Sequence, residues 1–282
     1  MNKLHSLSEN DIEVLLSSVG NDFVMEREGY HVRLADTFHH RNQASLLIKR
    51  LYSNRGYSTK KSIDPYNLDA NVVTLVAFTG DQLFGTVSVG IDSPQGLLAD
   101  ELYQPEIDEY RQAGRKVGEF SKLAVDPTLN SKEVLASLYH LAYMQLGPLL
   151  GVTDAFIEVN PRHVPFYRRM LGFRQIGETR NCPRVNAPAS LLHMEMSEIA
   201  AQILRFGGTR DPHERSLYPF FLSPREEDGL VRRSSERPLP DRREKLSEAN
   251  QARHTFSDKR GNERGELREL GRNHLVAVSA KA

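Results

Sequence analysis

Two segments of the chain bring together side chains that can move protons or bind charged groups. The first is the apolar run 117–125, VGEFSKLAV, and the second is the segment 160–173, NPRHVPFYRRMLGF. Their polar and charged members include Glu119, Ser121 and Lys122 in the first segment, and Asn160, Arg162, His163 and Tyr167 in the second. A carboxylate such as that of Glu119 can accept a proton, and a hydroxyl such as that of Tyr167 can donate one. The two segments therefore carry residue types suited to acid and base catalysis.

Both segments also have a purely structural interpretation. Glu119 could be a structural carboxylate that pairs with Lys122 or Arg115. Segment 160–173 could be a helix that packs two aromatic rings into the core and ends at Gly172. The residue types alone leave both interpretations open.

The composition limits the classes of protein to which the chain can belong. The 37 Lys and Arg residues balance the 37 Asp and Glu residues, so no global field attracts nucleic acid or an anionic membrane. No stretch approaches the roughly 20 apolar residues of a membrane-spanning helix, and residues 1–20 lack the apolar core of a signal peptide. The single cysteine, Cys182, excludes an internal disulfide framework and favours a reducing cytoplasm. Since no cysteine-histidine signature accompanies it, we expect a buried, inert thiol.

A sheet domain must position these segments. Between residues 31 and 200, strand-like apolar runs alternate with helical ones, which indicates an α/β or α+β domain with a mixed central sheet flanked by helices. The β-branched runs 72–78 and 83–91, around a glycine turn, predict a hairpin. The order of strands and helices from residue 117 onward predicts at least one parallel crossover. The further expected elements are strands at 31–35, 154–159, 173–176 and 191–196, helices at 41–54, 131–144 and 164–170, and a loop-and-helix insertion at 93–118.

The composition divides the chain into three parts. We expect an N-terminal helical extension at 1–30 and the sheet domain at 31–222. Residues 223–282 are dense in charge and poor in apolar side chains, so they cannot bury enough surface to offset their ordering entropy. They are predicted to form a disordered tail.

Segment 160–173 resembles a pattern of the GNAT acyltransferase superfamily. In that pattern an asparagine follows a strand end, the next helix bears Phe-Tyr, and the helix ends at Gly-Phe. Phe166 and Tyr167 match the aromatic pair, and Gly172 and Phe173 match the ending. The resemblance implies a strand edge that holds the thioester arm of an acyl donor, with the tyrosine hydroxyl near the sulfur.

A second resemblance concerns residues 119–125, EFSKLAV. They are similar to a strand of the acyl-homoserine-lactone synthases, but Lys122 stands where those enzymes have an arginine. Lysine lacks the planar bidentate fork of arginine, which argues against the acceptor of the lactone synthases. Further matches are the segments 35–40 (ADTFHH), 55–57 (RGY) and 180–196 (RNCPRVNAPASLLHMEM). With these matches, residues 30–222 look most like the N-acyl amino acid synthases of the same superfamily. This resemblance implies an acyl carrier protein as donor carrier and an amino acid as acceptor.

The loop after the central strand bears on the donor. Ordinary GNAT enzymes hold the pyrophosphate of coenzyme A on the amides of a glycine-bearing loop, whereas residues 126–133 contain no glycine. This difference favours acyl-phosphopantetheine as the co-substrate, without a metal or other cofactor, and leaves coenzyme A as the alternative. The cations around segment 160–173 would suit an acidic carrier protein or form an ordinary solvated face. The residues expected to bind the donor are Ser121, Lys122, Asn160, Arg162 and His163, with a surface role as the alternative for His163.

The resemblance also implies a mechanism of direct transfer from the thioester to an amine. Free α-amino groups have pKa values of roughly 7.7 to 8.0 in peptides and are mostly protonated near neutrality, so a base or a water relay is required. We expect Glu119 to be that base, Tyr167 to donate a proton to the departing sulfur, and backbone amides of the central strand to stabilise the oxyanion. Leu98 and Leu102 are expected to contact the acyl chain, and Tyr57 the acceptor. The alternatives are a coenzyme A-dependent N-acetyltransferase and a noncatalytic module that binds acylated carrier protein.

Overall fold

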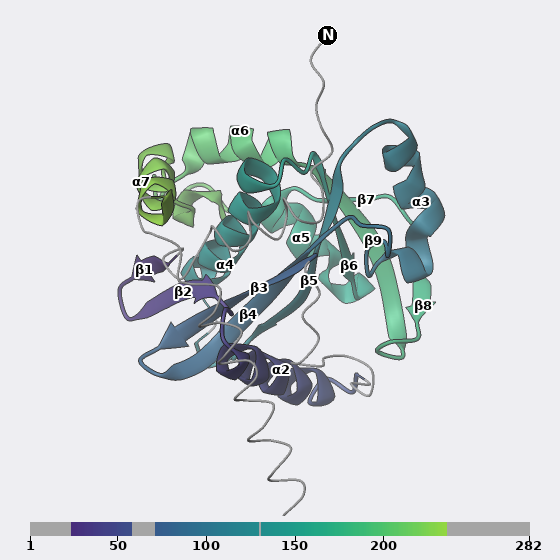
Figure 1. Ribbon diagram of the computed structural model, residues 1–282, viewed down its shortest axis with the longest axis horizontal. Helices are drawn as coiled ribbons and strands as arrows, with labels where there is room; N and C mark the ends of the chain where they lie inside the picture. The colour runs from purple at the N-terminus through teal and green to yellow at the C-terminus, as the bar shows by residue number, and fades with distance from the viewer. Residues whose placement is uncertain (1–23, 58–70, 130, 236–282) are drawn as a thin grey trace, which may run out of the picture. The chain divides into compact units, whose positions relative to one another are not determined.

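The computed structural model describes residues 24–57, 71–129 and 131–235. Within these ranges the chain forms a nine-stranded mixed sheet with helices on both faces (Figure 1). The strands are β1 (Met25–Arg27), β2 (Tyr30–Leu34), β3 (Val72–Thr79), β4 (Gln82–Ile91), β5 (Val117–Val125), β6 (Asp154–Val159), β7 (Arg174–Gln175), β8 (Arg180–Cys182) and β9 (Ala187–Glu195). The helices are α2 (Phe38–Ser53), α3 (Asp100–Gln112), α4 (Lys132–Met144), α5 (Val164–Leu171), α6 (Met196–Phe206) and α7 (Pro224–Ser235), with short helical turns η1 (Gln145–Leu149), η2 (Pro161–His163) and η3 (Tyr218–Phe220).

The order of the strands confirms the predicted hairpin and crossover. The sheet runs β1-β2-β3-β4-β5-β6-β9-β7, with β8 paired to β9. Its pairs are antiparallel except β5 and β6, which are parallel and joined through α4. That pairing ends at Phe120 and Ile157, although β5 continues to Val125 and β6 to Val159. The carboxyl ends of these two strands are therefore not joined by ladder hydrogen bonds.

A β-bulge in β5 lies at the same place. Thr86 of β4 pairs with Ala124 of β5. Ser88, two positions further along β4, pairs with Ser121, three positions back along β5. The extra residue makes a bulge, and Lys122 within it has a left-handed φ of 53°. The bulge bends β5 where it parts from β6.

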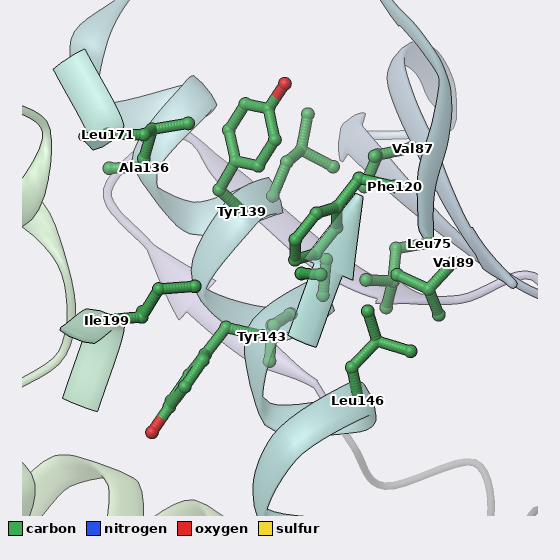
Figure 2. Close-up of a cluster of buried hydrophobic side chains, with 14 of the residues drawn as sticks. Leu75, Val87, Val89, Phe120, Ala136, Tyr139, Tyr143, Leu146, Leu171 and Ile199 are labelled. Atoms are coloured by element: carbon green, nitrogen blue, oxygen red, sulfur yellow. The ribbon is translucent and has the colours of Figure 1, made fainter. Parts of the chain in front are cut away.

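The alternation of side chains along β3 divides the core between the two faces of the sheet. Leu75 and Ala77 pack with α4, whereas Val76 and Phe78 pack with α2 on the opposite face. Figure 2 shows the α4 side, where Phe120 packs among aromatic and aliphatic side chains. A third cluster packs α3 against β6 and β9, on the same face as α2. The two helices α2 and α3 therefore flank one face of the sheet.

The predicted boundary of the charged tail is wrong, because residues 224–235 form α7. The side chain of Glu226 accepts a hydrogen bond from the amide of Ser223 at 2.7 Å, and the Ser223 hydroxyl accepts one from the amide of Glu226 at 3.4 Å. This reciprocal pair is a capping box, which starts a helix despite the charged composition. Leu230 anchors α7 in the core with 1% of its surface exposed. Residues 236–282 lie outside the described part of the chain.

The N-terminal boundary also differs from the prediction. The expected helical extension at 1–30 is wrong over its last residues, because Met25–Arg27 forms β1 and pairs with β2. Met25 is buried in the core, which outweighs the helical pattern of a short polar segment. Residues 1–23 lie outside the described ranges. Strand β8 and helix α6 were not predicted, because β8 has only three residues and α6 begins directly after the last residue of strand β9.

Candidate active site

A cavity of about 1150 Å³ is lined on one side by residues of the sheet face that α2 and α3 flank, and it also reaches residues of α4 and α5. Its lining comes from β3 to β6, from α2, α4, α5 and η2, from the start of α3 and the segment before it, and from β8, β9 and the turn between them. The predicted site residues that line it are Tyr57, Leu98, Glu119, Ser121, Lys122, Asn160, His163 and Tyr167. Arg162 contacts the rim through Tyr57, whereas Leu102 lies outside the lining and packs against the α3 cluster. The fold therefore gathers most of the expected residues around one cavity.

Glu119 lies at the base of this cavity with 5% of its surface exposed. Its two carboxylate oxygens accept hydrogen bonds from the amides of Leu98 at 2.9 Å and Ala99 at 3.0 Å. Burial raises the pKa of Glu119 to about 7, although the two amides oppose the shift. Gly90 gives the carboxyl its space, because a Cβ there would lie 2.9 Å from Glu119 Cγ. A carboxyl group with this pKa can accept a proton near neutral pH.

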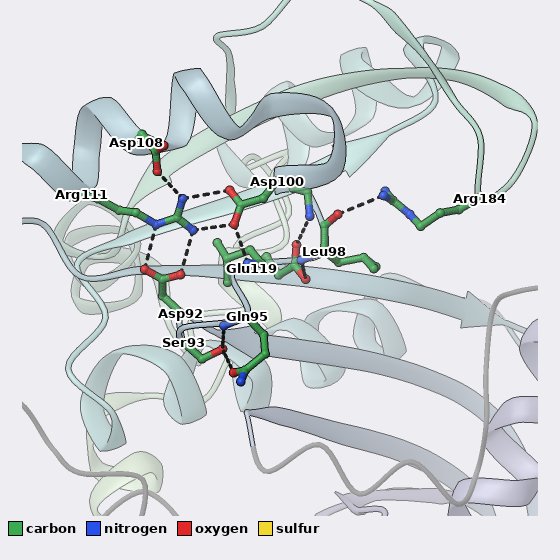
Figure 3. A network of polar contacts seen from close by, with 11 residues as sticks. Asp92, Ser93, Gln95, Leu98, Asp100, Asp108, Arg111, Glu119 and Arg184 are labelled. Atoms are coloured by element: carbon green, nitrogen blue, oxygen red, sulfur yellow. Dashed lines mark hydrogen bonds and ion pairs between the residues drawn. The ribbon is translucent and has the colours of Figure 1, made fainter.

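An ion-pair network fixes the segment whose amides bind Glu119 (Figure 3). Arg111 of α3 binds three carboxylates at 2.6 to 2.8 Å, those of Asp92, Asp100 and Asp108. Asp100 in turn accepts a hydrogen bond from the amide of Leu97 at 2.6 Å. The network therefore holds the start of α3 against the end of β4. It positions Glu119 without touching it.

Two arginines that could have paired with Glu119 bind other carboxylates. Arg115, one of the two partners considered from the sequence, donates to Asp154 at 3.1 Å and to Glu195 at 3.0 Å. Arg184, which the sequence interpretation missed, binds Glu158 at 2.6 Å and also pairs with Glu101. Glu119 forms no ion pair with any residue that the structure describes. The sequence signal for the ion pair between Arg184 and Glu158 was that Glu158 is a carboxylate inside the mostly apolar strand β6.

Tyr167 lies on α5 and is buried at the edge of the cavity. Its hydroxyl accepts a hydrogen bond from the hydroxyl of Tyr139 at 2.9 Å, so its own proton remains available for another acceptor. Burial raises the pKa of Tyr167, and the bond from Tyr139 opposes the shift. The phenol is therefore protonated at neutral pH. Tyr139, on α4, was predicted only as part of a helix, because its spacing is that of a core residue.

The rim of the cavity joins segment 160–163 to the end of α2. Arg162 donates a hydrogen bond to the Tyr57 hydroxyl at 2.7 Å and another to His163 Nε2 at 3.2 Å. Burial and the neighbouring arginine charges lower the pKa of His163, so its ring is neutral at pH 7. The side chain of Asn160 caps η2 through the amide of Arg162 and donates to the carbonyl of Pro188 at 3.2 Å. Asn160 therefore holds the backbone in place at this rim.

Cys182 lines the same cavity with 1% of its surface exposed. Burial raises the pKa of its thiol, which disfavours the nucleophilic thiolate. In the part of the chain that the structure describes, no group of three or more His, Cys, Asp or Glu side chains is arranged to hold a metal ion. None of the helices described here has the length and apolar character to cross a membrane.

Comparison with known proteins assigns this chain to a family. A family model described as N-acyl amino acid synthase FeeM matches residues 43–195, which is more than half of the chain. This chain belongs to the FeeM family. Among solved structures it is similar to FeeM, an N-acyl amino acid synthase from uncultured soil microbes, with 28% identity and a TM-score of 0.57. The alignment covers 61% of this chain and 94% of that one.

Two further solved structures have a lower identity and TM-score than FeeM. A nucleotide-linked sugar GNAT named FdhC is 14% identical, with a TM-score of 0.43 and coverage of 66% of this chain and 97% of that one. A GNAT acetyltransferase from Streptococcus pneumoniae is also 14% identical, with a TM-score of 0.41 and coverage of 59% and 98%. Comparison with curated proteins gives no significant match. Membership of the FeeM family makes this protein an N-acyl-transferring enzyme with a GNAT fold, and the matched range contains both Glu119 and Tyr167.

Proposed function

We propose that this protein transfers a long-chain acyl group from acyl carrier protein to the amino group of an amino acid, in the cytoplasm. The observation that carries the proposal is that Glu119, with a pKa of about 7, and the proton-donating Tyr167 line one cavity of about 1150 Å³. Pockets for small molecules usually measure about 300 to 1,000 Å³. A larger cavity suits an amino acid and a long acyl chain together better than an acetyl group.

The two residues divide the proton transfers between them. Glu119 takes a proton from the ammonium group of the acceptor, and the resulting amine attacks the thioester carbon. Backbone amides of β5 near the bulge stabilise the oxyanion until the carbon–sulfur bond breaks. Tyr167 gives its proton to the departing sulfur. The nitrogen loses its second proton as the amide forms, and this proton replaces the one that Tyr167 gave up. The products are an N-acyl amino acid and free phosphopantetheine thiol.

The loop after β5 supports a carrier-protein donor over coenzyme A. The amide of Thr128 donates to the carboxylate of Asp126 at 3.1 Å, and the amide of Val134 donates to the Ser131 hydroxyl at 3.2 Å. Hydrogen bonds from Thr128 lower the pKa of Asp126, so a negative charge remains in this loop. These amides are already bonded and lie near a carboxylate that repels phosphate. A phosphopantetheine arm, with its single phosphate, demands less of the loop than a pyrophosphate does.

The cations near segment 160–173 supply a docking surface for an acidic carrier protein. Arg168 and Arg169 are exposed on α5, whereas Arg174 already forms an ion pair with Glu198 at 3.2 Å. We therefore assign docking to Arg168 and Arg169. The donor arm lies along Ser121, Lys122, Asn160, Arg162 and His163.

The acyl chain and the rim residues are assigned from their positions in the lining. Leu98, with 41% of its surface exposed, belongs to the apolar part of the cavity near α3, and we place the acyl chain there. Leu102 takes no part in this assignment. Because Tyr57 accepts a hydrogen bond from Arg162, we assign it to the donor end rather than to the acceptor, its expected contact.

The test is an assay of the purified protein with the twenty amino acids and one acyl group carried either by acyl carrier protein or by coenzyme A. Mass spectrometry should detect N-acyl amino acids formed from the acylated carrier protein, and far less product from acyl-coenzyme A. Transfer only from acetyl-coenzyme A would identify an acetyltransferase instead. Binding of acylated carrier protein without product would identify a noncatalytic module.

A further inference from the structure

Arg41, on the first turn of α2, contributes a positive charge to the cavity lining. Its guanidinium donates to the backbone carbonyls of Ala35 at 3.3 Å and Asp36 at 3.0 Å, and its Nε is buried without a partner among the described residues. The carboxylate of Asp36 accepts hydrogen bonds from Arg33 at 3.2 Å and His40 at 2.9 Å instead. Burial lowers the pKa of Arg41. Arg41 is thus a half-buried cation that forms no ion pair within the described ranges.

A row of hydroxyl groups crosses the sheet from the Arg41 anchor to β5. The amide of Ala35 donates to the carbonyl of Thr74 at 2.8 Å, Thr74 pairs with Ser88, and Ser88 pairs with Ser121. The hydroxyls of Thr74 and Ser88 lie 2.8 Å apart, and all three hydroxyl residues line the cavity. Ser121 is two positions from Glu119, so the two share a face of β5. The row therefore leads from a cation to the expected base.

The width of this row matches a small zwitterion. The step from β2 to β5 covers three strand spacings of about 4.8 Å, or about 14 Å. Two hydrogen bonds of about 3 Å each, one from the guanidinium to the carbonyl of Ala35 and one from the guanidinium to a carboxylate, take up about 6 Å of this distance. The guanidinium itself and an α-amino acid, whose amine and carboxylate are separated by one carbon, fit within the remaining distance of about 8 Å. Its amine then lies above β4 and β5, on the side of Glu119.

We propose that Arg41 binds the carboxylate of the acceptor amino acid while Thr74 and Ser88 border its path to Glu119. This inference rests on the proposed function, because it assigns the acceptor end of the same site. A guanidinium binds a carboxylate through two charge-assisted hydrogen bonds, and the hydrogen bonds of Arg41 to Ala35 and Asp36 use only its Nη1, which leaves other N–H groups for a carboxylate. The pair selects amino acids over amines that lack a carboxylate.

The experiment measures kcat/KM of wild type and Arg41→Gln for the best amino acid acceptor and for its carboxamide. The charged hydrogen bonds are lost, so Arg41→Gln should reduce kcat/KM for the amino acid about 10- to 100-fold. For the carboxamide it should change kcat/KM less than about threefold, since that acceptor has no carboxylate to lose. Activity with the carboxamide also shows that the variant is folded. Arg50→Gln is the matched control, because Arg50 lies on the same helix, exposed and paired with Asp126 at 2.8 Å.

The outcomes separate this inference from the proposed function. An equal change of kcat/KM for both acceptors in Arg41→Gln, or no change for either, would overturn the role of Arg41 while N-acylation by wild type still stands. Arg41→Lys keeps the positive charge but lacks the planar pair of donors of a guanidinium. It should therefore retain part of the preference for the amino acid over its carboxamide that Arg41→Gln loses. If wild type acylates no amino acid at all, the proposed function fails and this inference fails with it.

Discussion

The basicity of Glu119 comes from its position rather than from a charged partner. Burial raises its pKa to about 7, and the amides of Leu98 and Ala99 keep that shift from being larger. Tyr167 complements it, because burial raises the pKa of the phenol and keeps it protonated. One residue can therefore accept a proton at the pH at which the other still has one to donate.

The first prediction concerns the pH dependence of the reaction. Below pH 7 Glu119 is protonated and cannot take a proton, so kcat/KM of wild type should rise as the pH rises through about 7. In Glu119→Gln the rise with a midpoint of about 7 should be replaced by one that follows the ionisation of the acceptor's own amino group, and kcat/KM near pH 7 should fall by about 100-fold or more. Glu101→Gln, at an exposed carboxylate of the same cavity, should keep the midpoint. A pH profile of Glu119→Gln with the wild-type midpoint would exclude Glu119 as the base.

The second prediction separates the two tyrosines. Tyr167→Phe removes the donor to the sulfur and should lower kcat by about 100-fold or more, because a general acid typically contributes at least that much. Tyr139→Phe removes only the hydrogen bond that Tyr167 accepts, so it should cost activity far less. Single-turnover rates measure both effects. Equal rates for the two variants would contradict the assignment of Tyr167.

At the scale of the elements, β4 and the segment leading into α3 enclose Glu119 from two sides. Gly90 on β4 leaves room for the carboxyl group, and the segment fixed by Arg111 supplies the amides that bind it. The bulge in β5 and the end of its pairing with β6 fall within a few residues of this carboxyl group. Several elements therefore converge on one side chain.

The third prediction tests this enclosure. In Gly90→Ala the new Cβ meets Glu119 Cγ at 2.9 Å, so the carboxyl group must move and the pH midpoint should shift. Gly85→Ala, also on β4, meets Ala77 and Leu138 at 3.1 and 3.3 Å instead. Both variants should lose about 1 to 3 kcal/mol of unfolding free energy through overpacking. Thermal unfolding and pH profiles distinguish them, and an unchanged midpoint in folded Gly90→Ala would refute the enclosure.

At the scale of the whole molecule, the absence of a net charge makes local patches decide which partners dock. The sequence has equal numbers of acidic and basic residues, so the exposed Arg168 and Arg169 on α5 act only over a short range. A docking surface of this kind affects the carrier protein and leaves the chemistry of the thioester unchanged.

The fourth prediction uses that separation. Reversing both charges, Arg168→Glu with Arg169→Glu, should raise KM for acylated carrier protein about tenfold or more, because like charges then face each other. The rate with a small acyl-pantetheine donor should stay near that of wild type. Arg205→Glu, at an exposed position of α6, is the control and should change neither. Steady-state kinetics at several salt concentrations measure the effect, and a KM unaffected by the reversal would place docking elsewhere.

Features that depend on neighbouring residues could be predicted from the amino-acid sequence. Periodicity predicted the β3–β4 hairpin, and segment 160–173 predicted a strand end, a short helix and a glycine end, since each depends on local patterns. The contacts between distant residues appear only in the folded chain. Folding brings the amides of the α3 segment to Glu119, leaves Arg41 without an ion pair in the described residues, and buries Leu230 of the charged helix α7 in the core. Burial and pairing across the sheet set these properties, and neither follows from spacing along the chain.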